Sequence, residues 1–208
     1  MGGIPPATTV PRRASCVDPS RYASSVPGTF PSPLARQLLA LTRRCDGDFV
    51  PPLSWRHRLG QELRDLGPQA GANVEKYVDS LLELAHLVVL VQDELLVGYC
   101  AYYWPWMWRG TEHVYVSTAV VAPSHRGRGL STRMGRRVVA HALRRRVPLL
   151  AKTWSTNQAS MGALARWGRV DKIVRDERGA GIDTVYWRLD TSDPVAALGV
   201  ILANARTA

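Results

Sequence analysis

The sequence reads Val120-Val121-Ala122-Pro123-Ser124-His125-Arg126-Gly127-Arg128-Gly129-Leu130-Ser131 where a run of β-branched residues ends and a helical pattern begins. The glycines allow a tight turn and let a ligand approach the backbone closely. Free amides at a helix start, together with the helix dipole, form a site for phosphate oxygens. Arg126 and Arg128 can form forked hydrogen bonds with such oxygens. The stretch therefore predicts a phosphate-binding strand–loop–helix unit.

Two other phosphate-binding motifs are excluded by this spacing. The chain has no Gly-x-x-x-x-Gly-Lys-Ser/Thr segment. It also has no Gly-x-Gly-x-x-Gly run followed by an acidic ribose ligand. A P-loop nucleotidase and a dinucleotide-binding domain are therefore not indicated.

The segments around this unit alternate between the two hydrophobic periods. Period-two and β-branched patterns predict strands at Leu87–Gln92, Leu95–Trp104, His113–Val121, Leu149–Ser155, Ile173–Arg175 and Thr184–Leu189. Helical spacing predicts helices at Leu34–Arg44, Trp55–Leu66, Val74–Ala85, Leu130–Arg146, Gln158–Trp167 and Pro194–Ala203. A loop is expected over Pro105–Gly110. This order predicts an α+β fold, with one βαβ unit inside a mostly antiparallel sheet.

The length of 208 residues suits one domain with extensions. Residues 1–31 are rich in Gly, Pro, Ser and Thr, which predicts a disordered leader. The domain proper is expected over 32–190, with a C-terminal helical extension over 191–208.

The net charge of +10 comes almost wholly from arginine, since lysine occurs only at Lys76, Lys152 and Lys172. Either recognition of a polyanion or the arginine codons of a GC-rich genome accounts for it. No apolar run reaches the roughly 18–20 residues that cross a bilayer, so no membrane partner is expected. The three cysteines show no metal-ligand spacing, so we expect no metal and a reduced cytoplasmic setting.

The segment Arg126-Gly127-Arg128-Gly129-Leu130-Ser131 resembles the Arg/Gln-x-x-Gly-x-Gly/Ala motif of the GNAT (GCN-five-related N-acetyltransferase) superfamily. The resemblance covers about Leu87 to Leu189. It implies the GNAT fold: a mixed, mostly antiparallel sheet with flanking helices and a splayed central strand pair, His113–Val121 and Leu149–Ser155.

The resemblance also implies acetyl-CoA or another acyl-CoA as co-substrate. Main-chain groups of Ala119, Val120 and Val121 would hold its pantetheine. The segment Arg126, Gly127, Arg128, Gly129, Leu130, Ser131 and Thr132 would hold its pyrophosphate. Asn157 matches the asparagine that follows the family's fifth strand. The tyrosine that often protonates the departing thiolate falls at Leu164, and Arg169 replaces the aromatic residue after Gly168, so the usual general acid is missing.

Three residues near the start of the central strand are candidates for proton transfer: His113, Tyr115 and Glu112. His113, Tyr115 and Ser117 alternate onto one face, and family members often have a base near Tyr115. His113 is the better base, because an unperturbed imidazole titrates near about 6.5. Glu112 would take the role if a bulge reverses the face. Each of the first two has a structural alternative, because the histidine could cap a strand end and the tyrosine could fill the core.

The helix after the motif carries a row of arginines: Arg133, Arg136, Arg137, Arg144 and Arg145. The row is either a solvated face or a surface that follows nucleic-acid phosphates, such as those of tRNA. Three tryptophans near the end of the second predicted strand could belong to the core, line an acceptor pocket, stack on bases or form a dimer contact: Trp104, Trp106 and Trp108.

The leading hypothesis is a GNAT-type N-acyltransferase that moves an acetyl or acyl group to a primary amine of a small molecule by direct attack in a ternary complex. The first alternative is a tRNA-dependent acyl or aminoacyl transferase in a biosynthetic pathway. The second is a non-catalytic CoA-binding module. A monomer or a homodimer fits each of them.

Overall fold

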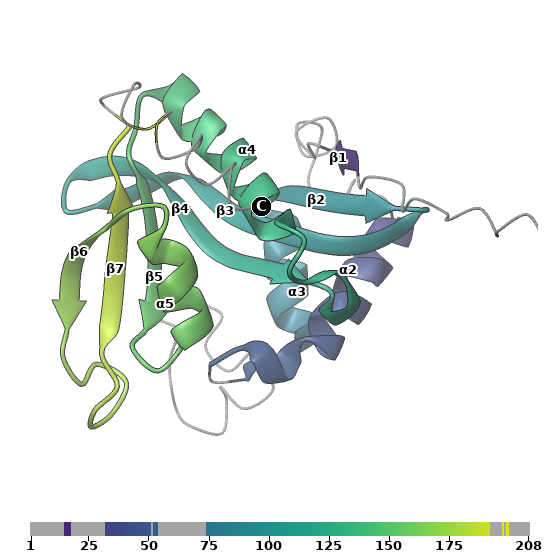
Figure 1. Ribbon diagram of the computed structural model, residues 1–208, viewed down its shortest axis with the longest axis horizontal. Helices are drawn as coiled ribbons and strands as arrows, with labels where there is room; N and C mark the ends of the chain where they lie inside the picture. The colour runs from purple at the N-terminus through teal and green to yellow at the C-terminus, as the bar shows by residue number, and fades with distance from the viewer. Residues whose placement is uncertain are drawn as a thin grey trace, which may run out of the picture.

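The computed structural model describes residues 15–17, 32–50, 52–53 and 74–191, together with residues 197 and 199. These residues build one sheet of seven strands in the order β1-β2-β3-β4-β5-β7-β6 (Figure 1). The strands are β1 Ser15–Val17, β2 His86–Gln92, β3 Leu95–Trp108, β4 Thr111–Val121, β5 Leu149–Trp154, β6 Arg169–Val174 and β7 Thr184–Leu189. Neighbouring strands are antiparallel except β4 and β5, which are parallel and are joined through a helix. The predicted α+β class and sheet type are confirmed.

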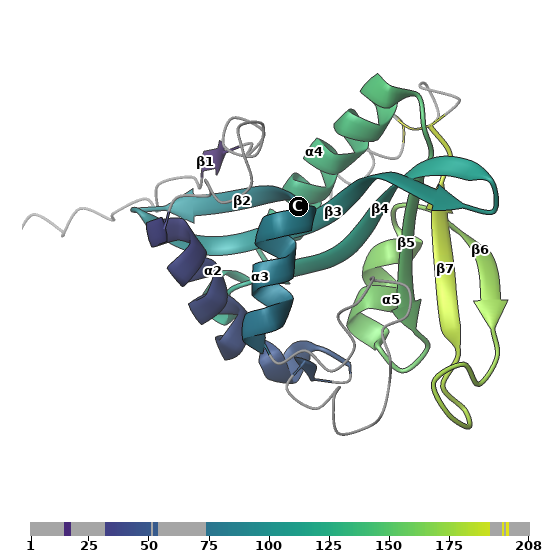
Figure 2. The same cartoon turned by 180° about the vertical axis from the view of Figure 1, so that it is seen from behind.

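Helices cover both faces of the sheet (Figures 1 and 2). On one face lie α2 Ser32–Arg44 and α3 Val74–Leu84, whose leucines, valines and tyrosine pack on β2 and β3 in one core cluster. On the other face lies α4 Leu130–Arg145, whose Met134, Val138 and Ala142 belong to a second cluster. The short α5 Gln158–Ala165 lies on the same side as α4, in front of β5 in Figure 1. None of the described helices is long and apolar enough to cross a membrane.

The strands β4 and β5 separate partway along their length. Their pairing runs only from Val114 opposite Leu149 to Val116 opposite Ala151. Beyond this point β4 continues to Val121 on β3, and β5 continues to Trp154 on β7. The register of β3 and β4 shifts at Ala101/Tyr102, where one extra β4 residue forms a bulge that turns this part of the strand. The splayed central pair expected from the sequence is present.

Two predicted boundaries are wrong. β3 continues through Pro105 to Trp108, where a loop over Pro105–Gly110 was expected. Pro105 is tolerated because it lies at a second register shift, between Tyr103 and Trp106, where a missing amide donor breaks no regular ladder. β6 begins at Arg169, earlier than the predicted Ile173. Its outer positions are exposed, so it lacks the apolar alternation that reveals a strand.

Three predicted segments fall wholly or largely outside the described residues. The helices expected at Trp55–Leu66 and Pro194–Ala203 lie outside them, apart from residues 197 and 199. In the leader expected to be disordered, only Ser15–Val17 are described, and they pair with β2 as the edge strand β1.

Candidate active site

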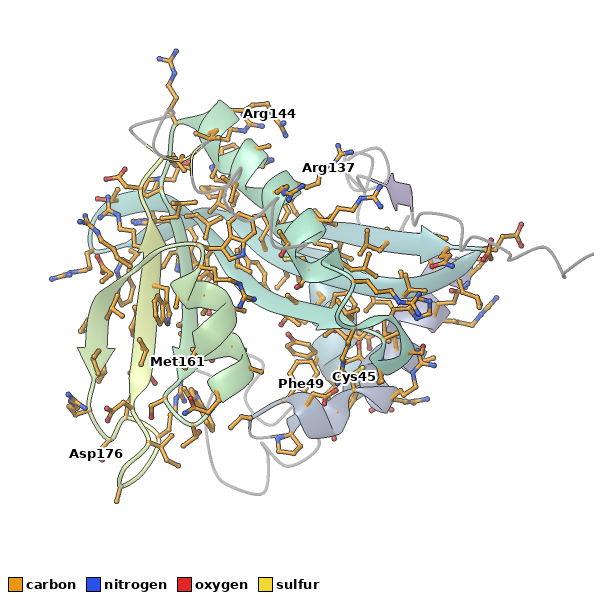
Figure 3. All side chains as sticks on the ribbon, viewed as in Figure 1. Cys45, Phe49, Arg137, Arg144, Met161 and Asp176 are labelled. Atoms are coloured by element: carbon orange, nitrogen blue, oxygen red, sulfur yellow. The ribbon has the colours of Figure 1, made fainter. Side chains whose placement is uncertain are left out.

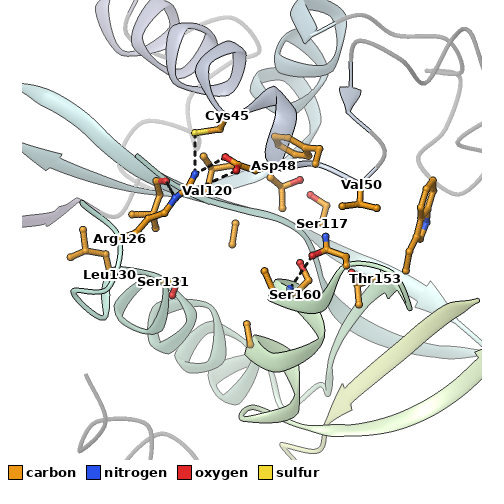
Figure 4. Close-up of a pocket in the computed structure, with 18 of the residues that line it drawn as sticks. Cys45, Asp48, Val50, Ser117, Val120, Arg126, Leu130, Ser131, Thr153 and Ser160 are labelled. Atoms are coloured by element: carbon orange, nitrogen blue, oxygen red, sulfur yellow. Dashed lines mark hydrogen bonds and ion pairs between the residues drawn. The ribbon is translucent and has the colours of Figure 1, made fainter. Parts of the chain in front are cut away.

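A cavity of about 500 Å³ lies where β4 and β5 separate (Figure 4). The turn that follows α2 closes one side, and the starts of α4 and α5 close the other. Its lining combines polar, apolar and charged residues: Cys45, Asp48, Phe49, Val50, Tyr115, Ser117, Thr118, Ala119, Val120, Val121, His125, Arg126, Gly127, Gly129, Leu130, Ser131, Lys152, Thr153, Trp154, Asn157, Ala159, Ser160, Ala163 and Arg178. The cavity thus joins the glycine-rich loop to the gap in the sheet.

The glycine-rich loop has the geometry that its sequence predicts. Gly127 and Gly129 have φ of 71° and 69°, in the left-handed region that favours glycine. Gly129 is the N-cap of α4, and no side chain caps this helix. The first amides of a helix have no acceptor within the helix. A Cβ placed on Gly127 would meet no heavy atom within 4 Å, so the loop has open space beside its backbone. The loop therefore fits an anionic group such as a pyrophosphate.

The two arginines of the loop hold it in place. The Arg126 Nε donates to the Val121 carbonyl oxygen at 3.1 Å, and its guanidinium forms an ion pair with Asp48 at 2.5 Å. This ion pair raises the pKa of Arg126, mainly through the hydrogen bond to Asp48. Arg128 donates to the Ser124 carbonyl at 3.2 Å. Arg128 and the buried Thr132 do not line the cavity, unlike the other predicted cofactor residues.

The Arg126–Asp48 pair also fixes the corner after α2 to the loop. Asp48 belongs to the short 3-10 helix η1 Asp46–Asp48. Cys45, one residue before it, lies 3.7 Å from the Arg126 guanidinium. Burial, and then the neighbouring Asp48, raise the pKa of the Cys45 thiol. The cysteine is therefore protonated at neutral pH.

Main-chain groups of β4 point into the gap. The Ala122 amide donates to the Val97 carbonyl of β3 at 2.8 Å. Because hydrogen-bonded pairs alternate along an antiparallel ladder, Val120 also bonds to β3, whereas Ala119 and Val121 direct their amides toward β5. The β5 partner is absent at this level, so these amides can bind a ligand that lies along β4. Figure 4 shows Val120 and Ser117 on the strand that crosses the cavity.

Of the three proton-transfer candidates, Tyr115 alone lines the cavity. Its ring is 4% exposed and stacks on Trp106, with ring centroids 4.7 Å apart, and on Tyr103 at 6.3 Å. Burial raises the pKa of Tyr103 to about 12. Below Tyr115, the Ser117 hydroxyl donates to the Ala101 carbonyl at 3.3 Å. The two ring contacts hold Tyr115 in the wall of the cavity.

His113 and Glu112 are not brought to the cavity. His113 is 1% exposed, and its Nδ1 lies 2.9 Å from the Thr111 carbonyl oxygen. Burial lowers the pKa of this imidazole, so it is neutral at physiological pH. Glu112 lies opposite Met107 in the β3–β4 hairpin. The alternation of side chains along β4 does not show where along the strand the cavity ends.

Asn157 lines the cavity and performs a local structural role. Its side-chain oxygen accepts a hydrogen bond from the Ser160 amide at 3.0 Å, which caps α5. Leu164, at the position of the family's tyrosine, does not line the cavity, whereas Ser160 and Ala163 do. The described residues thus offer no phenol from α5.

Sequence reasoning missed part of the lining. Lys152 and Trp154 lie on β5, and Arg178 lies in the β6–β7 connection. The guanidinium of Arg178 lies 5.6 Å from the centre of the Trp154 ring. The rarity of lysine was the one signal that could have singled out Lys152. Among the described residues, no group of three or more His, Cys, Asp or Glu side chains could hold a metal ion.

Comparisons with known proteins agree with this geometry. A sequence model of the acetyltransferase (GNAT) family matches residues 53–168, more than half of the chain. No curated protein has a significantly similar sequence.

Solved structures with the same fold share little sequence with this chain. A putative GNAT-family acetyltransferase from Desulfovibrio desulfuricans is 17% identical, with a TM-score of 0.59 over 86% of this chain and 99% of its own. Aminoglycoside 6'-acetyltransferase type Ii is 13% identical, with a TM-score of 0.56 over 80% of this chain and 96% of its own. The putative acetyltransferase yncA from Salmonella typhimurium, solved with its cofactor acetyl-CoA, is 15% identical, with a TM-score of 0.51 over 76% and 91%.

Proposed function

Because this chain belongs to the acetyltransferase (GNAT) family, we propose that it transfers an acetyl group from acetyl-CoA to a primary amine of a small molecule, by direct attack in a ternary complex. One observation carries the proposal: the gap between β4 and β5 opens beside an uncapped helix start, and a single cavity includes both. A phosphorylated, extended donor fits this combination.

The donor is held mainly by the backbone in this proposal. Amides from Gly127 to Ser131 bind the pyrophosphate, which the α4 dipole also favours. The pantetheine takes the place of the missing β5 partner and bonds to Ala119 and Val121. Arg126 acts at a distance, since its hydrogen bonds go to Asp48 and Val121.

The chemical step requires a neutral amine and a polarised thioester carbonyl. The amine nitrogen attacks the carbonyl carbon, the C–N bond forms, and the C–S bond breaks as the thiolate leaves. The developing negative charge on the carbonyl oxygen is stabilised by a main-chain amide of β4 at the gap. The amine's proton passes to solvent or through the Tyr115 hydroxyl, and the thiolate takes up one proton from the same pool.

Deprotonation of the amine is assisted by the charges in the cavity. Asp48 is the one carboxylate among the described lining residues, and it is bonded to Arg126. Lys152 and Arg178 add positive charge to the same lining. Nearby cations disfavour an ammonium ion and lower the pKa of a bound amine. The site therefore favours the reactive neutral amine without a carboxylate base among its described residues.

The test is the release of free thiol from acetyl-CoA by the purified chain in the presence of a panel of primary amines. We expect acceptor-dependent release, and double-reciprocal plots that intersect when both substrates are varied. Parallel plots would contradict direct attack, and acceptor-independent release alone would contradict amine acetylation.

A second candidate function is favoured by the surface of α4. The helix contains five arginines and no acidic residue, and Arg137 and Arg144 lie on its exposed side (Figure 3). Arg145 is partly engaged, with its guanidinium 4.0 Å from the centre of the Trp104 ring. An aminoacyl-tRNA that serves as donor or acceptor could bind along this row. Binding of bulk tRNA that weakens steeply with salt, and competes with acetyl-CoA, would favour this candidate.

A further inference from the structure

A carboxylate lies beside the loop that is proposed to bind the pyrophosphate. Asp48 lines the cavity together with Gly127, Gly129, Leu130 and Ser131, and it is the one carboxylate among the described lining residues. Because like charges repel each other, a carboxylate at this place opposes the binding of a phosphorylated donor. Its position is therefore unfavourable for donor binding unless another group balances its charge.

Arg126 balances the charge of Asp48 through a forked contact. Its Nη1 and Nη2 donate to the two carboxylate oxygens of Asp48 at 3.3 Å and 2.5 Å (Figure 4). The same fork of donors suits a phosphate group, so Asp48 occupies the edge of Arg126 that phosphate oxygens would use. The neighbouring Cys45 thiol adds no charge, because burial raises its pKa. Asp48 therefore offsets the positive charge that Arg126 brings to the donor site.

The backbone around each partner is held by contacts other than the ion pair. The Arg126 Nε donates to the Val121 carbonyl oxygen at 3.1 Å, and the Asp48 amide donates to the Cys45 carbonyl oxygen at 3.0 Å. The side chains of Arg126 and Asp48 are 46% and 51% exposed, and ion pairs this exposed stabilise a fold little. The charges of the pair therefore matter more for a ligand in the cavity than for the local shape of either segment.

We propose that Asp48 sets the affinity of the donor site. By offsetting the charge of Arg126, it weakens the binding of acetyl-CoA and of the product CoA, which carry the same pyrophosphate, and so favours product release. This inference rests on the proposed acetyl transfer and adds a residue that limits donor affinity. Binding that is equally strong for substrate and product does not accelerate the chemical step, and slow product release often limits turnover.

The first test measures the binding of acetyl-CoA and of CoA by calorimetry. Asp48→Asn keeps the size of the side chain and removes its charge. We expect it to bind both ligands more tightly than the parent chain by about threefold or more at low salt, and to lose most of this gain at about 0.5 M salt. Damage to the fold would weaken binding, so a gain in affinity identifies an effect of charge.

Glu75→Gln is the matched control for Asp48→Asn. Glu75 also forms an exposed ion pair with an arginine, Arg43, but neither residue lines the cavity. The substitution changes the net charge of the chain by the same amount as Asp48→Asn. We expect it to leave the affinity for acetyl-CoA unchanged, and a gain equal to that of Asp48→Asn would overturn the inference.

Arg126→Gln distinguishes charge balance from a simple tether between the loop and the corner after α2. Charge balance predicts that Arg126→Gln binds acetyl-CoA more weakly by about threefold or more, and that the double variant with Asp48→Asn has an affinity between those of the two single variants. A tether would be broken by either substitution. Equally weakened binding in both single variants and in the double variant would therefore overturn the inference.

A donor without phosphates locates the effect at the loop. S-Acetylpantetheine has the thioester and the pantetheine of acetyl-CoA but no pyrophosphate. With one amine as acceptor, we expect Asp48→Asn to raise the ratio of kcat/KM for acetyl-CoA to kcat/KM for S-acetylpantetheine by about threefold or more. An unchanged ratio would place the effect away from the pyrophosphate and overturn the inference.

The outcomes separate this inference from the proposed function. If Asp48→Asn binds acetyl-CoA no more tightly than the parent chain, while the parent chain releases thiol with an amine, the inference is overturned and acetyl transfer stands. Tighter binding by Asp48→Asn, without thiol release by any amine, would support the role of Asp48 and contradict acetyl transfer. Absence of acetyl-CoA binding by the parent chain would overturn both.

Discussion

Of the predicted catalytic residues, Tyr115 is the one that lines the cavity. Its ring is fixed between Trp106 and Tyr103, so the Tyr115→Phe substitution removes one oxygen without changing the packing. We expect kcat for acetyl transfer to fall about tenfold to a hundredfold, because proton transfer by a positioned group contributes at least this much. The KM for acetyl-CoA should change little.

The control for Tyr115→Phe is Tyr103→Phe. Tyr103 stacks on the same cluster but does not line the cavity. Steady-state kinetics of the two variants on one amine checks the assignment. Equal rates for Tyr115→Phe and the parent chain would exclude the Tyr115 hydroxyl from the reaction.

His113 illustrates a residue whose chemistry predicts a base but whose position gives it a structural role. Burial lowers its pKa from the usual 6.5, so the folded state binds its proton less readily than the unfolded state. The unfolded chain therefore takes up the extra proton first as the pH falls below about 6.5, and the free energy of unfolding decreases, by up to about 1.4 kcal/mol per pH unit. The contribution is fully present above pH 6.5.

Urea unfolding between pH 7.5 and 5 measures this effect, with His113→Gln as the comparison. We expect the substituted chain to lose less stability on acidification than the parent chain. If the free energy of unfolding depends on pH equally in both chains, His113 is not the group responsible for the loss of stability in acid.

At the scale of elements, features encoded within one short segment could be predicted from the sequence, whereas features that depend on long-range contacts could not. The unit from Val120 to the end of α4 was predictable because the strand, the turn glycines and the helix signals lie within one short segment. The ion pair between Arg126 and Asp48 joins residues 78 positions apart and leaves no local signal. β3 continues past Pro105 because a bulge forms there in its pairing with β4. This bulge depends on the partner strand, so it could not be predicted from the residues around Pro105.

The connection from α5 to β6 passes close to β7 at Gly168. A Cβ on Gly168 would lie 2.5 Å from the Arg188 carbonyl oxygen of β7, closer than packed atoms allow. We expect Gly168→Ala to lower the free energy of unfolding by about 1–3 kcal/mol, because the backbone must shift.

The control for this position is Gly162→Ala in α5 itself. A Cβ there meets no heavy atom within 4 Å, so alanine should stabilise the chain by about 0.5–1 kcal/mol through its helix propensity. Chemical denaturation of both variants provides the comparison. A Gly168→Ala chain as stable as the parent would contradict the close approach of Gly168 to β7.

At the scale of the whole molecule, the sequence was sufficient to predict the fold class and the position of the glycine-rich loop. This part of the cavity lining was not predictable, because it combines Lys152, Trp154 and Arg178 from two segments with a corner that follows α2. Each of these residues occurs in a pattern that is equally typical of a surface. Their meeting at one cavity depends on the order of β5, β7 and β6 in the sheet.

The central claim is that acetyl-CoA binds at the start of α4, and Ser131 allows it to be tested without strain. Ser131 is exposed, lies in the first turn and lines the cavity. Ser131→Glu places a carboxylate among the proposed phosphate-binding amides. The helix dipole stabilises a negative charge at this position, so the substitution should not destabilise the helix. Ser131→Gln has nearly the same size and no charge.

Calorimetric titration of acetyl-CoA into these three chains is therefore the most direct measurement. The account predicts one site per chain, with similar affinity for the parent and Ser131→Gln, and binding by Ser131→Glu that is weaker by at least about tenfold without a lower melting temperature. Equal affinity for Ser131→Glu and Ser131→Gln, or no binding by the parent chain, would contradict it.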